Sequence, residues 1–128
     1  MKEQIAFAAI RTEHRLFVGT THIEAEASLV REPGLAGEEK ARLLLARVDG
    51  FLTDTGRFVF REEAFKIAAQ AAQMIDHPCA NDPAANQAFY GGDQPKLDSG
   101  LIKDYAPIRV PLESALTTAR VREVTDPC

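Results

Sequence analysis

The sequence has few cysteines and no long apolar segment. Only two cysteines occur among its 128 residues, and Cys128 is the last residue. Two cysteines are too few for a disulfide framework, so we expect reduced thiols and a cytoplasmic protein. No apolar run approaches the roughly 20 residues of a membrane-spanning helix, and the first residues lack the pattern of a signal peptide. We therefore expect no membrane partner.

An excess of positive charge is also missing. The chain has 15 Lys and Arg against 19 Asp and Glu, which gives a formal net charge of -4. This balance argues against broad electrostatic attraction to nucleic acid, so no nucleic-acid partner is expected. A few well-placed arginines can still bind one small anion, and the candidates are Arg11, Arg15, Arg57, Arg61 and Arg109.

Recognisable catalytic and metal motifs are absent from the sequence. His77 and Cys79 lie close together, but a structural zinc site needs a second pair of ligands and none is nearby. No base can be identified that would activate Cys79 as a nucleophile. The glycines at 91 and 92 are not followed by the Gly-Lys-Ser/Thr of a phosphate loop. We expect no catalytic residue, no bound metal and no cofactor.

What is present fits one globular domain spanning residues 1–128. Hydrophobic residues make up 45% and charged residues 27% of the chain, which is typical of a globular protein. A chain of this length builds one core and is too short for two ordinary domains. Within it, residues 76–101 are expected to form a long loop region, and residues 102–128 a C-terminal extension whose order the sequence does not decide.

The N-terminal part predicts a β-hairpin followed by a helix. Strand-forming residues fill 5–11 and 16–19, and a short polar connection separates them. Thr21 and Glu24 match the capping-box spacing, so a helix is expected to begin near His22. Its apolar face is predicted to contain Ile23, Ala27 and Val30.

A second helix is predicted over residues 38–48, which are rich in strong helix formers. Three consecutive leucines in this stretch would also suit a buried strand, but the flanking Glu, Lys and Arg favour a helix. Its apolar face is predicted to contain Ala41, Leu44, Leu45 and Val48.

The central stretch predicts a hairpin that leads directly into a helix. Residues 51–60 have two strand-forming runs around Gly56, which takes a positive φ at little cost. After Phe60 the apolar period changes from 2 to about 3.6, and a helix is expected as far as Ile75. Two carboxylates, Glu62 and Glu63, fall in its first turn, where the helix dipole favours negative charge.

The C-terminal third predicts less regular structure. Pro, Gly and Asn recur between 76 and 95, and a helical turn is expected only within residues 84–90. A short extended piece is expected around Tyr105 and residues 108–110, and a final helix over residues 112–124. Together these elements predict an α+β fold, with a small antiparallel sheet built from two hairpins and packed against two to three helices.

The second hairpin also carries a candidate binding surface. On an alternating strand Arg57, Val59 and Arg61 share one side, while Phe58 and Phe60 share the other. The ordinary interpretation places the phenylalanines in the core and the arginines in solvent. Arginines beside aromatic surface also suit a nucleotide-like ligand, since guanidinium groups bind phosphate and stack on bases. The residues alone leave both interpretations open.

Several segments together resemble a family of small phage and prophage proteins. They are Ile-Ala-Phe-Ala-Ala-Ile-Arg at 5–11, Phe-Val-Gly-Thr-Thr-His at 17–22, Gly-Phe-Leu-Thr-Asp-Thr-Gly-Arg-Phe-Val at 50–59, and Arg-Glu-Glu-Ala at 61–64. Within these proteins the pattern is similar to the Thoeris anti-defence 1 type of viral sponge. The resemblance covers about the first three-fifths of the chain, except for residues 31–48.

This resemblance implies a function. Such sponges have no catalytic activity and sequester a cyclic ADP-ribose isomer in the host cytoplasm, as homo-oligomers (dimers or higher) with a ligand pocket shared between protomers. Matching positions then become candidates for binding this small anionic nucleotide, and Tyr105 is added as a side chain able to stack on adenine. The candidate set is Arg11, His22, Phe51, Thr53, Arg57, Phe58, Arg61 and Tyr105.

Two other functions remain open. An acidic phage protein of this size can inhibit by binding a host protein directly. An enzyme that degrades a nucleotide would use His14 or His22, but neither lies in a His-x-Thr or His-x-Ser motif.

Overall fold

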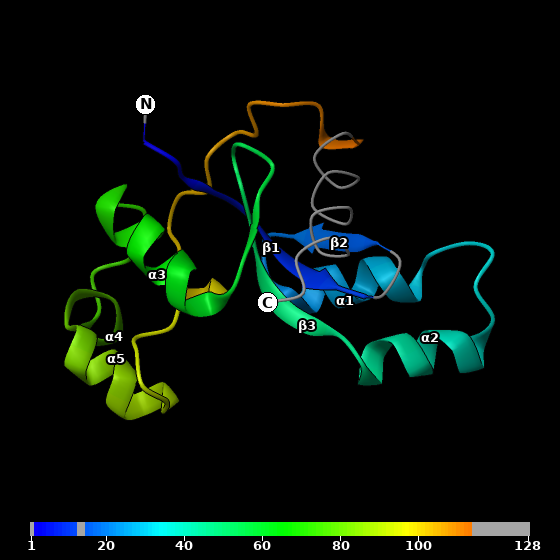
Figure 1. Ribbon diagram of the computed structural model, residues 1–128, viewed down its shortest axis with the longest axis horizontal. Coiled ribbons are helices and arrows are strands. Elements are labelled where there is room, and N and C mark those ends of the chain that lie inside the picture. Colours follow the sequence, from blue (N-terminus) through cyan, green and yellow to red (C-terminus); the bar gives the residue numbers. More distant parts are fainter. Residues whose placement is uncertain (1, 13–14, 114–128) are drawn as a thin grey trace.

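The structure, a computed structural model, describes residues 2–12 and 15–113 (Figure 1). Its centre is a four-stranded antiparallel sheet in the order β2-β1-β3-β4. The strands are β1 (Ile5–Arg11), β2 (Leu16–Gly19), β3 (Val48–Thr53) and β4 (Phe58–Val59). Two hairpins therefore build the sheet, and the predicted α+β fold class is confirmed.

Five α-helices and one 3-10 helix accompany the sheet in the described part of the chain. They are α1 (His22–Val30), α2 (Gly37–Leu45), α3 (Arg61–Gln70), α4 (Pro78–Asn81), α5 (Pro83–Tyr90) and η1 (Ser99–Leu101). Helix α1 packs on β1 and β2, and α3 packs on β3 and β1. Figure 1 shows α1 and α2 on one side of the molecule and α3, α4 and α5 on the other. None of the helices in these ranges is long and apolar enough to cross a bilayer.

Strand alternation divides the buried residues between the two faces of the sheet. On the helix-covered face, Phe51 packs with Ala64 and Ala68 of α3, and a neighbouring cluster joins β1 and β2 to α1. The opposite face is built from Phe7, Ala9, Leu16, Val18, Leu52 and Phe58, and Ile108 and Val110 pack against it. Each face therefore buries its own set of strand residues.

Helix α1 begins where the sequence predicts, but a different face is buried. The hydroxyl of Thr21 accepts a hydrogen bond from the Glu24 amide at 3.0 Å, as expected for an N-cap. The predicted apolar face is wrong, because Ile23 is 78% exposed, while Ala25 and Leu29 are fully buried. The close approach of β2 to the helix decides this orientation: a Cβ on Gly19 would lie 2.6 Å from the Glu24 Cβ.

The predicted face of α2 and the predicted ends of α2 and α3 also need correction. Leu45 is 89% exposed and Leu43 is buried, and α2 ends at Leu45 because Val48 already belongs to β3. Helix α3 ends at Gln70 and not at Ile75. Ala72 adopts φ 55°, which stops the helix as a left-handed residue commonly does.

The early end of α3 places Gln73 against the start of β1. Its side-chain amide accepts a hydrogen bond from the Ile5 amide at 2.8 Å and donates to the Ile5 carbonyl at 2.9 Å. An amide side chain has both a donor and an acceptor, so it replaces a neighbouring strand at this point. The sequence does not indicate this long-range pairing.

Residues 76–101 contain more structure than the sequence indicates. Helix α5 contains the predicted turn at 84–90, and α4 and η1 were not predicted. Leu97 and Leu101 are buried in the same cluster as Phe51. The segment is therefore part of the core.

The chain after η1 runs past the start of β1 and the turn between β3 and β4. Ile102 forms a single β-bridge with Met74, and no strand is assigned over 103–113, where an extended piece was expected. Arg109 binds the Asp54 carboxylate at 2.8 Å, with its amide on the Asp54 carbonyl at the same distance. The helix predicted over 112–124 lies almost wholly outside the described residues.

Candidate functional site

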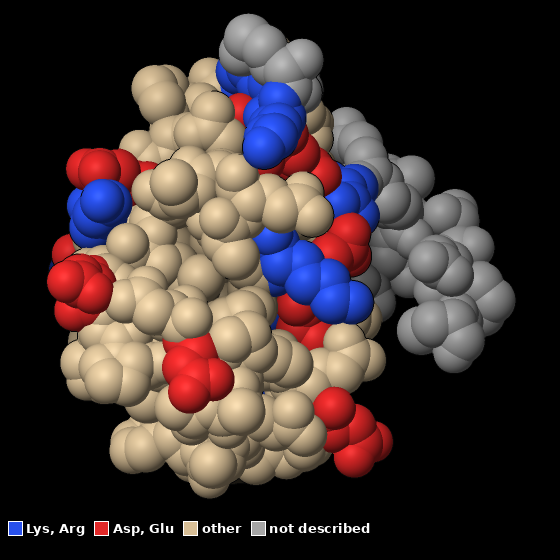
Figure 2. All heavy atoms as spheres, turned by 90° about the vertical axis from the view of Figure 1, so that its left-hand side faces the viewer, with Lys and Arg blue, Asp and Glu red and all other residues tan. Residues whose placement is uncertain are grey.

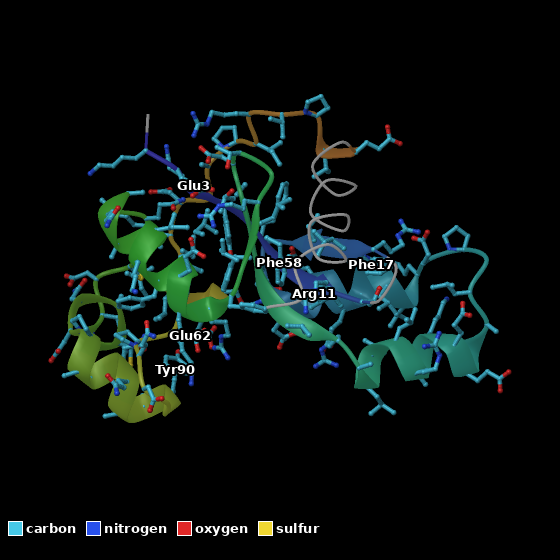
Figure 3. The ribbon with its side chains drawn as sticks, in the orientation of Figure 1. Glu3, Arg11, Phe17, Phe58, Glu62 and Tyr90 are labelled. Atoms are coloured by element: carbon cyan, nitrogen blue, oxygen red, sulfur yellow. The ribbon has the colours of Figure 1, made fainter. Side chains whose placement is uncertain are left out.

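The residues predicted to bind a ligand lie in three separate regions of the structure, and Figure 3 labels two of them, Arg11 and Phe58. Thr53 and Arg57 lie at the turn between β3 and β4. Arg11 and Phe58 lie together on the opposite face of the sheet. The remaining residues lie on or beside the helix-covered face, namely His22, Phe51, Arg61 and Tyr105. A single chain therefore does not bring the whole predicted set into one site.

At the β3–β4 turn, Arg57 is held by carboxylates of its own chain. Its guanidinium binds the two carboxylate oxygens of Glu3 at 3.1 and 2.7 Å, and an oxygen of Glu63 at 2.7 Å. These bonds from Arg57 lower the pKa of Glu3 from 4.5 to about 2. Thr53 is fully buried, and its hydroxyl accepts a hydrogen bond from the Arg57 amide at 3.2 Å. A ligand phosphate would have to compete with two carboxylates for this arginine.

On the helix-covered face, His22 and Phe51 are in direct contact. Their rings meet edge-on at 5.0 Å, and His22 Nε2 lies 2.8 Å from the Gly50 carbonyl oxygen. Phe51 is fully buried. Tyr105 packs against the same cluster, and its buried hydroxyl has no hydrogen-bond partner within the described residues. Burial raises the pKa of the Tyr105 phenol above its usual value.

Arg61 links α3 to the segment that follows α5. Its Nε donates a hydrogen bond to the Leu97 carbonyl at 2.9 Å, and its guanidinium carbon lies 5.6 Å from the centre of the Tyr90 ring. The Asp98 carboxylate lies 3.6 Å from the same guanidinium. These contacts hold Arg61 at the junction between the two segments.

Arg11, Phe58 and Phe60 form a cluster that we call the aromatic–arginine cluster. The Arg11 guanidinium carbon lies 5.2 Å from the Phe58 ring centre and 5.4 Å from that of Phe60, within the range of cation–π attraction. The two rings meet edge-on at 5.7 Å. A Cβ on Gly50 would lie 2.4 Å from the Phe58 ring, so only glycine fits beneath it. Phe60 stays 46% exposed.

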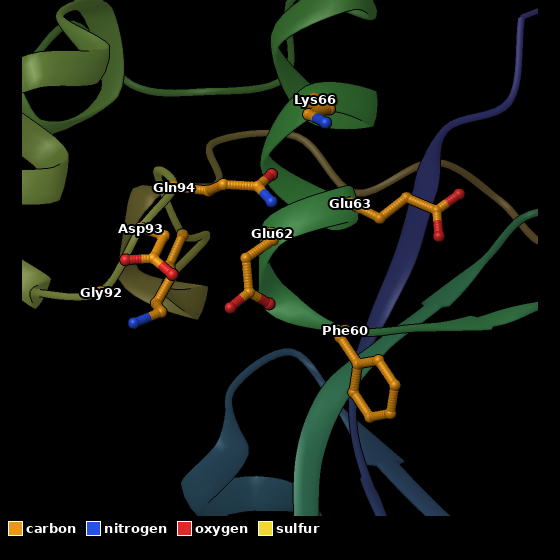
Figure 4. Close-up of a pocket in the computed structure, with 8 residues that line it drawn as sticks. Phe60, Glu62, Glu63, Lys66, Gly92, Asp93 and Gln94 are labelled. Carbon is orange, nitrogen blue, oxygen red and sulfur yellow. The ribbon is translucent and has the colours of Figure 1, made fainter. Parts of the chain in front are cut away.

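Phe60 also borders a hollow of about 770 Å³ at the start of α3, which we call the α3 hollow (Figure 4). One wall comes from the first turns of α3 and the other from the loop after α5. Phe60 is the N-cap residue of α3 and supplies no side-chain cap, so amides of the first turn are left without a side-chain acceptor. The lining residues are Phe60, Glu62, Glu63, Lys66, Gly92, Asp93, Gln94 and Lys96.

The loop wall of the α3 hollow is held in place by Asn86, which is fully buried. The side chain of Asn86 donates to the Cys79 carbonyl at 2.8 Å and to the Lys96 carbonyl at 2.7 Å. The amide of Lys96 donates back to the Asn86 side chain at 2.7 Å. Gly91 and Gly92 both have positive φ values, of 80° and 86°, which let the loop turn sharply.

Charge around this end of the molecule is mixed. Figure 2 shows this end with basic and acidic side chains interspersed among uncharged ones. The hollow itself combines Lys66 and Lys96 with Glu62, Glu63 and Asp93. In residues 2–12 and 15–113, no group of three or more His, Cys, Asp or Glu side chains is arranged to hold a metal ion. The chemistry available is therefore aromatic stacking together with both positive and negative charge.

Sequence reasoning missed the loop residues and gave Phe60 no place among the candidates. Phe60 was recognised as sharing a face with Phe58, and that alternation is the signal that points to it. Asp93 and Lys96 carry no such signal, because their loop meets α3 through hydrogen bonds between Leu97 and Arg61, which are distant in sequence. Spacing along the chain does not encode that contact.

Comparison with known proteins gives one family. A family model described as phage T4 y16D protein matches residues 4–90, which is more than half of the chain. The matched range runs from the start of the sheet to the end of α5 and includes the helical wall of the α3 hollow. The loop wall at 92–96 lies beyond it. No curated protein and no solved structure matches the chain.

Proposed function

Because the chain belongs to the phage T4 y16D protein family, we propose that it is a phage protein that binds a small anionic nucleotide in the host cytoplasm. The ligand we propose is a cyclic ADP-ribose isomer, held without being degraded, so that a host immune signal is removed. The resemblance to viral sponges supports this choice of ligand. The α3 hollow and the aromatic–arginine cluster support its place on the chain.

The observation that carries the proposal is the exposed ring of Phe60 between the cluster and the hollow. Phe60 is 46% exposed at the hollow, and its ring is held by Phe58 and by the Arg11 guanidinium. A flat base stacks on such a ring, as bases do on aromatic side chains in other nucleotide sites. Phe60 then orients the base at the mouth of the hollow.

Positive groups inside the hollow suit the phosphates. Lys66 and Lys96 line opposite walls, and the first-turn amides of α3 add the positive end of a helix dipole. Arg57 and Arg61 were predicted to bind the ligand, but neither lines the hollow. We therefore assign the phosphate-binding role to the two lysines.

One helix and one loop of a single chain form the hollow, so a ligand there stays open to water on its remaining sides. A second copy packed over the mouth would enclose the ligand and increase its affinity. For this reason we propose that the protein acts as a homo-oligomer, a dimer or higher. Ligand retention should then depend on protein concentration.

The test is capture and release of intact ligand. Purified protein is incubated with excess cyclic ADP-ribose isomers, separated from free ligand by gel filtration and heat-denatured, and the released material is identified by mass spectrometry. Near-stoichiometric release of unchanged ligand supports a sponge, whereas a hydrolysed product indicates an enzyme. Elution of the protein without any ligand overturns the proposal.

Two matched variants locate the site. Phe60→Ala removes the exposed ring at the hollow, and Phe89→Ala removes a ring that is 73% exposed on α5 and does not line the hollow. We expect Phe60→Ala to lose about fivefold or more in affinity, since base–aromatic stacking contributes about 1–3 kcal/mol. Phe89→Ala should bind like the wild type. Equal loss in both variants would contradict the assignment of Phe60.

A second candidate is direct binding of a host protein. It is favoured by two large apolar side chains that are exposed on the side of the molecule formed by α1 and α2 (Figure 1), Ile23 at 78% and Leu45 at 89%. Protein interfaces commonly use such side chains. Capture of a host protein from lysate that is abolished by Leu45→Ser and unaffected by Phe60→Ala would favour this function over nucleotide binding.

A further inference from the structure

Two carboxylates face each other across the α3 hollow. Glu62 extends from the first turn of α3, and Asp93 lies on the loop wall opposite it (Figure 4). Across the described ranges, neither carboxylate has a hydrogen bond or ion pair. Their neighbours differ in this respect, since Glu63 binds Arg57 and Asp98 lies beside Arg61. The hollow therefore presents two acceptors without protein donors.

These acceptors restrict the ligand. An ionised carboxylate only accepts hydrogen bonds, and two of them repel a ligand that carries nothing but negative charge. The lysines of the same hollow attract anions. A ligand that satisfies both kinds of group has an anionic part for Lys66 and Lys96 and hydroxyl or amine donors for Glu62 and Asp93.

We propose that Glu62 and Asp93 accept hydrogen bonds from the ribose hydroxyls of the nucleotide and make the site selective for ligands that carry them. This inference rests on the proposed function and assigns the hydroxyl-reading residues within it. A ribose presents hydroxyls on adjacent carbons between its base and its phosphate. With the base on Phe60 and the phosphate at the lysines, the hydroxyls reach the carboxylates in between. Acidic side chains bind ribose hydroxyls in the same way in dinucleotide-binding folds.

Different parts of the fold hold Glu62 and Asp93 in place. Glu62 belongs to a helix that is fixed to the core through Ala64 and Phe65. Asp93 belongs to a loop that Asn86 holds at Lys96, and Lys96 Nζ also bonds the Gly91 carbonyl at 3.0 Å. Rigid support keeps an acceptor at a fixed distance from its donor, which hydroxyl recognition requires. The loop lies outside the family-matched range, so this part of the selectivity belongs to the chain's own C-terminal segment.

Amide variants of the two carboxylates test the proposal, because the affinities for cyclic ADP-ribose and for pyrophosphate are expected to change differently. Glu62→Gln and Asp93→Asn keep the size of each side chain and remove its charge, and Glu38→Gln on the exposed start of α2 is the matched control. Affinity for cyclic ADP-ribose and for inorganic pyrophosphate is measured by titration calorimetry for each protein. We expect each hollow variant to bind cyclic ADP-ribose about tenfold more weakly, since hydrogen bonds to charged groups are worth that much. Pyrophosphate has no sugar hydroxyl, so the same variants should bind it equally or more tightly.

The outcomes separate this inference from the function on which it rests. Wild-type protein that binds no cyclic ADP-ribose overturns both. Wild-type binding that is unchanged or strengthened in Glu62→Gln and Asp93→Asn overturns the ribose assignment and leaves the sponge in place. Weakened cyclic ADP-ribose binding with unweakened pyrophosphate binding, in variants with wild-type thermal unfolding, supports the inference.

Discussion

Replacing Glu3 with Gln should destabilise the protein in a manner that depends on pH. Glu3 ties the N-terminal end of β1 to the β3–β4 turn through Arg57, and this contact lowers its pKa from 4.5 to about 2. A shift of that size corresponds to about 3 kcal/mol of stability. The Glu3 side chain is 24% exposed and that of Arg57 is 35% exposed, so screening by solvent reduces the expected contribution to about 1–2 kcal/mol.

The sign of the pH dependence follows from the direction of the shift. A carboxylate with a lowered folded pKa contributes its stability fully above the unfolded value of 4.5, and loses it as the pH falls toward 2. Urea unfolding of wild type and Glu3→Gln should therefore differ by about 1–2 kcal/mol at pH 7, and the difference should close by about pH 2.

Glu39→Gln, in the first turn of α2, is the control and should change stability by less than about 0.5 kcal/mol at pH 7. A Glu3→Gln difference that stays constant between pH 7 and pH 2.5 would refute the ion-pair explanation. The same measurement in about 1 M salt should shrink the difference, because salt screens exposed pairs.

Three further substitutions test the fold around the site. Ala72→Gly should raise the free energy of unfolding, measured in urea, by about 0.5–1 kcal/mol, because Ala72 has φ 55° and glycine adopts this conformation without strain. A lower free energy of unfolding would contradict this. Asn86→Ala should lower the free energy of unfolding by about 3 kcal/mol, since it removes the hydrogen bonds of backbone groups of Cys79 and Lys96. Asn81→Ala removes one exposed bond and should lower it by under about 1 kcal/mol. In Gly50→Ala the new Cβ would lie 2.4 Å from the Phe58 ring, so the ring has to move. We expect the unfolding temperature to fall by several degrees, and an unchanged temperature would refute the close packing.

The candidate site could be predicted only in part. Arg11 and Phe58 were identified from the sequence, and the structure brings them together with Phe60. Arg57 and Arg61 were identified as well, but the structure engages both with groups of their own chain. Which arginine is engaged depends on carboxyl and carbonyl groups distant in sequence, such as Glu3 and Leu97, and no local pattern specifies them.

The sequence by itself determined the elements whose cause is local. Branched and aromatic residues specify the strands of both hairpins, and the Thr21 cap specifies the start of α1. The glycine at position 56, whose φ is 88°, specifies the turn between β3 and β4. Each of these features depends on residues within a few positions of one another, so the local sequence is enough to specify it.

Only the tertiary structure decided which sides of the helices are buried and where the α3 hollow lies. Ala25 and Leu29 are buried instead of Ile23 because Gly19 brings β2 close to α1. Helix α3 stops at Gln70, and the residues that follow bring Gln73 to β1. The loop carrying Asp93 lies beside α3 because Leu97 and Arg61 exchange hydrogen bonds and Asn86 holds Lys96. Each of these features depends on contacts between distant segments, and those contacts form only when the core assembles.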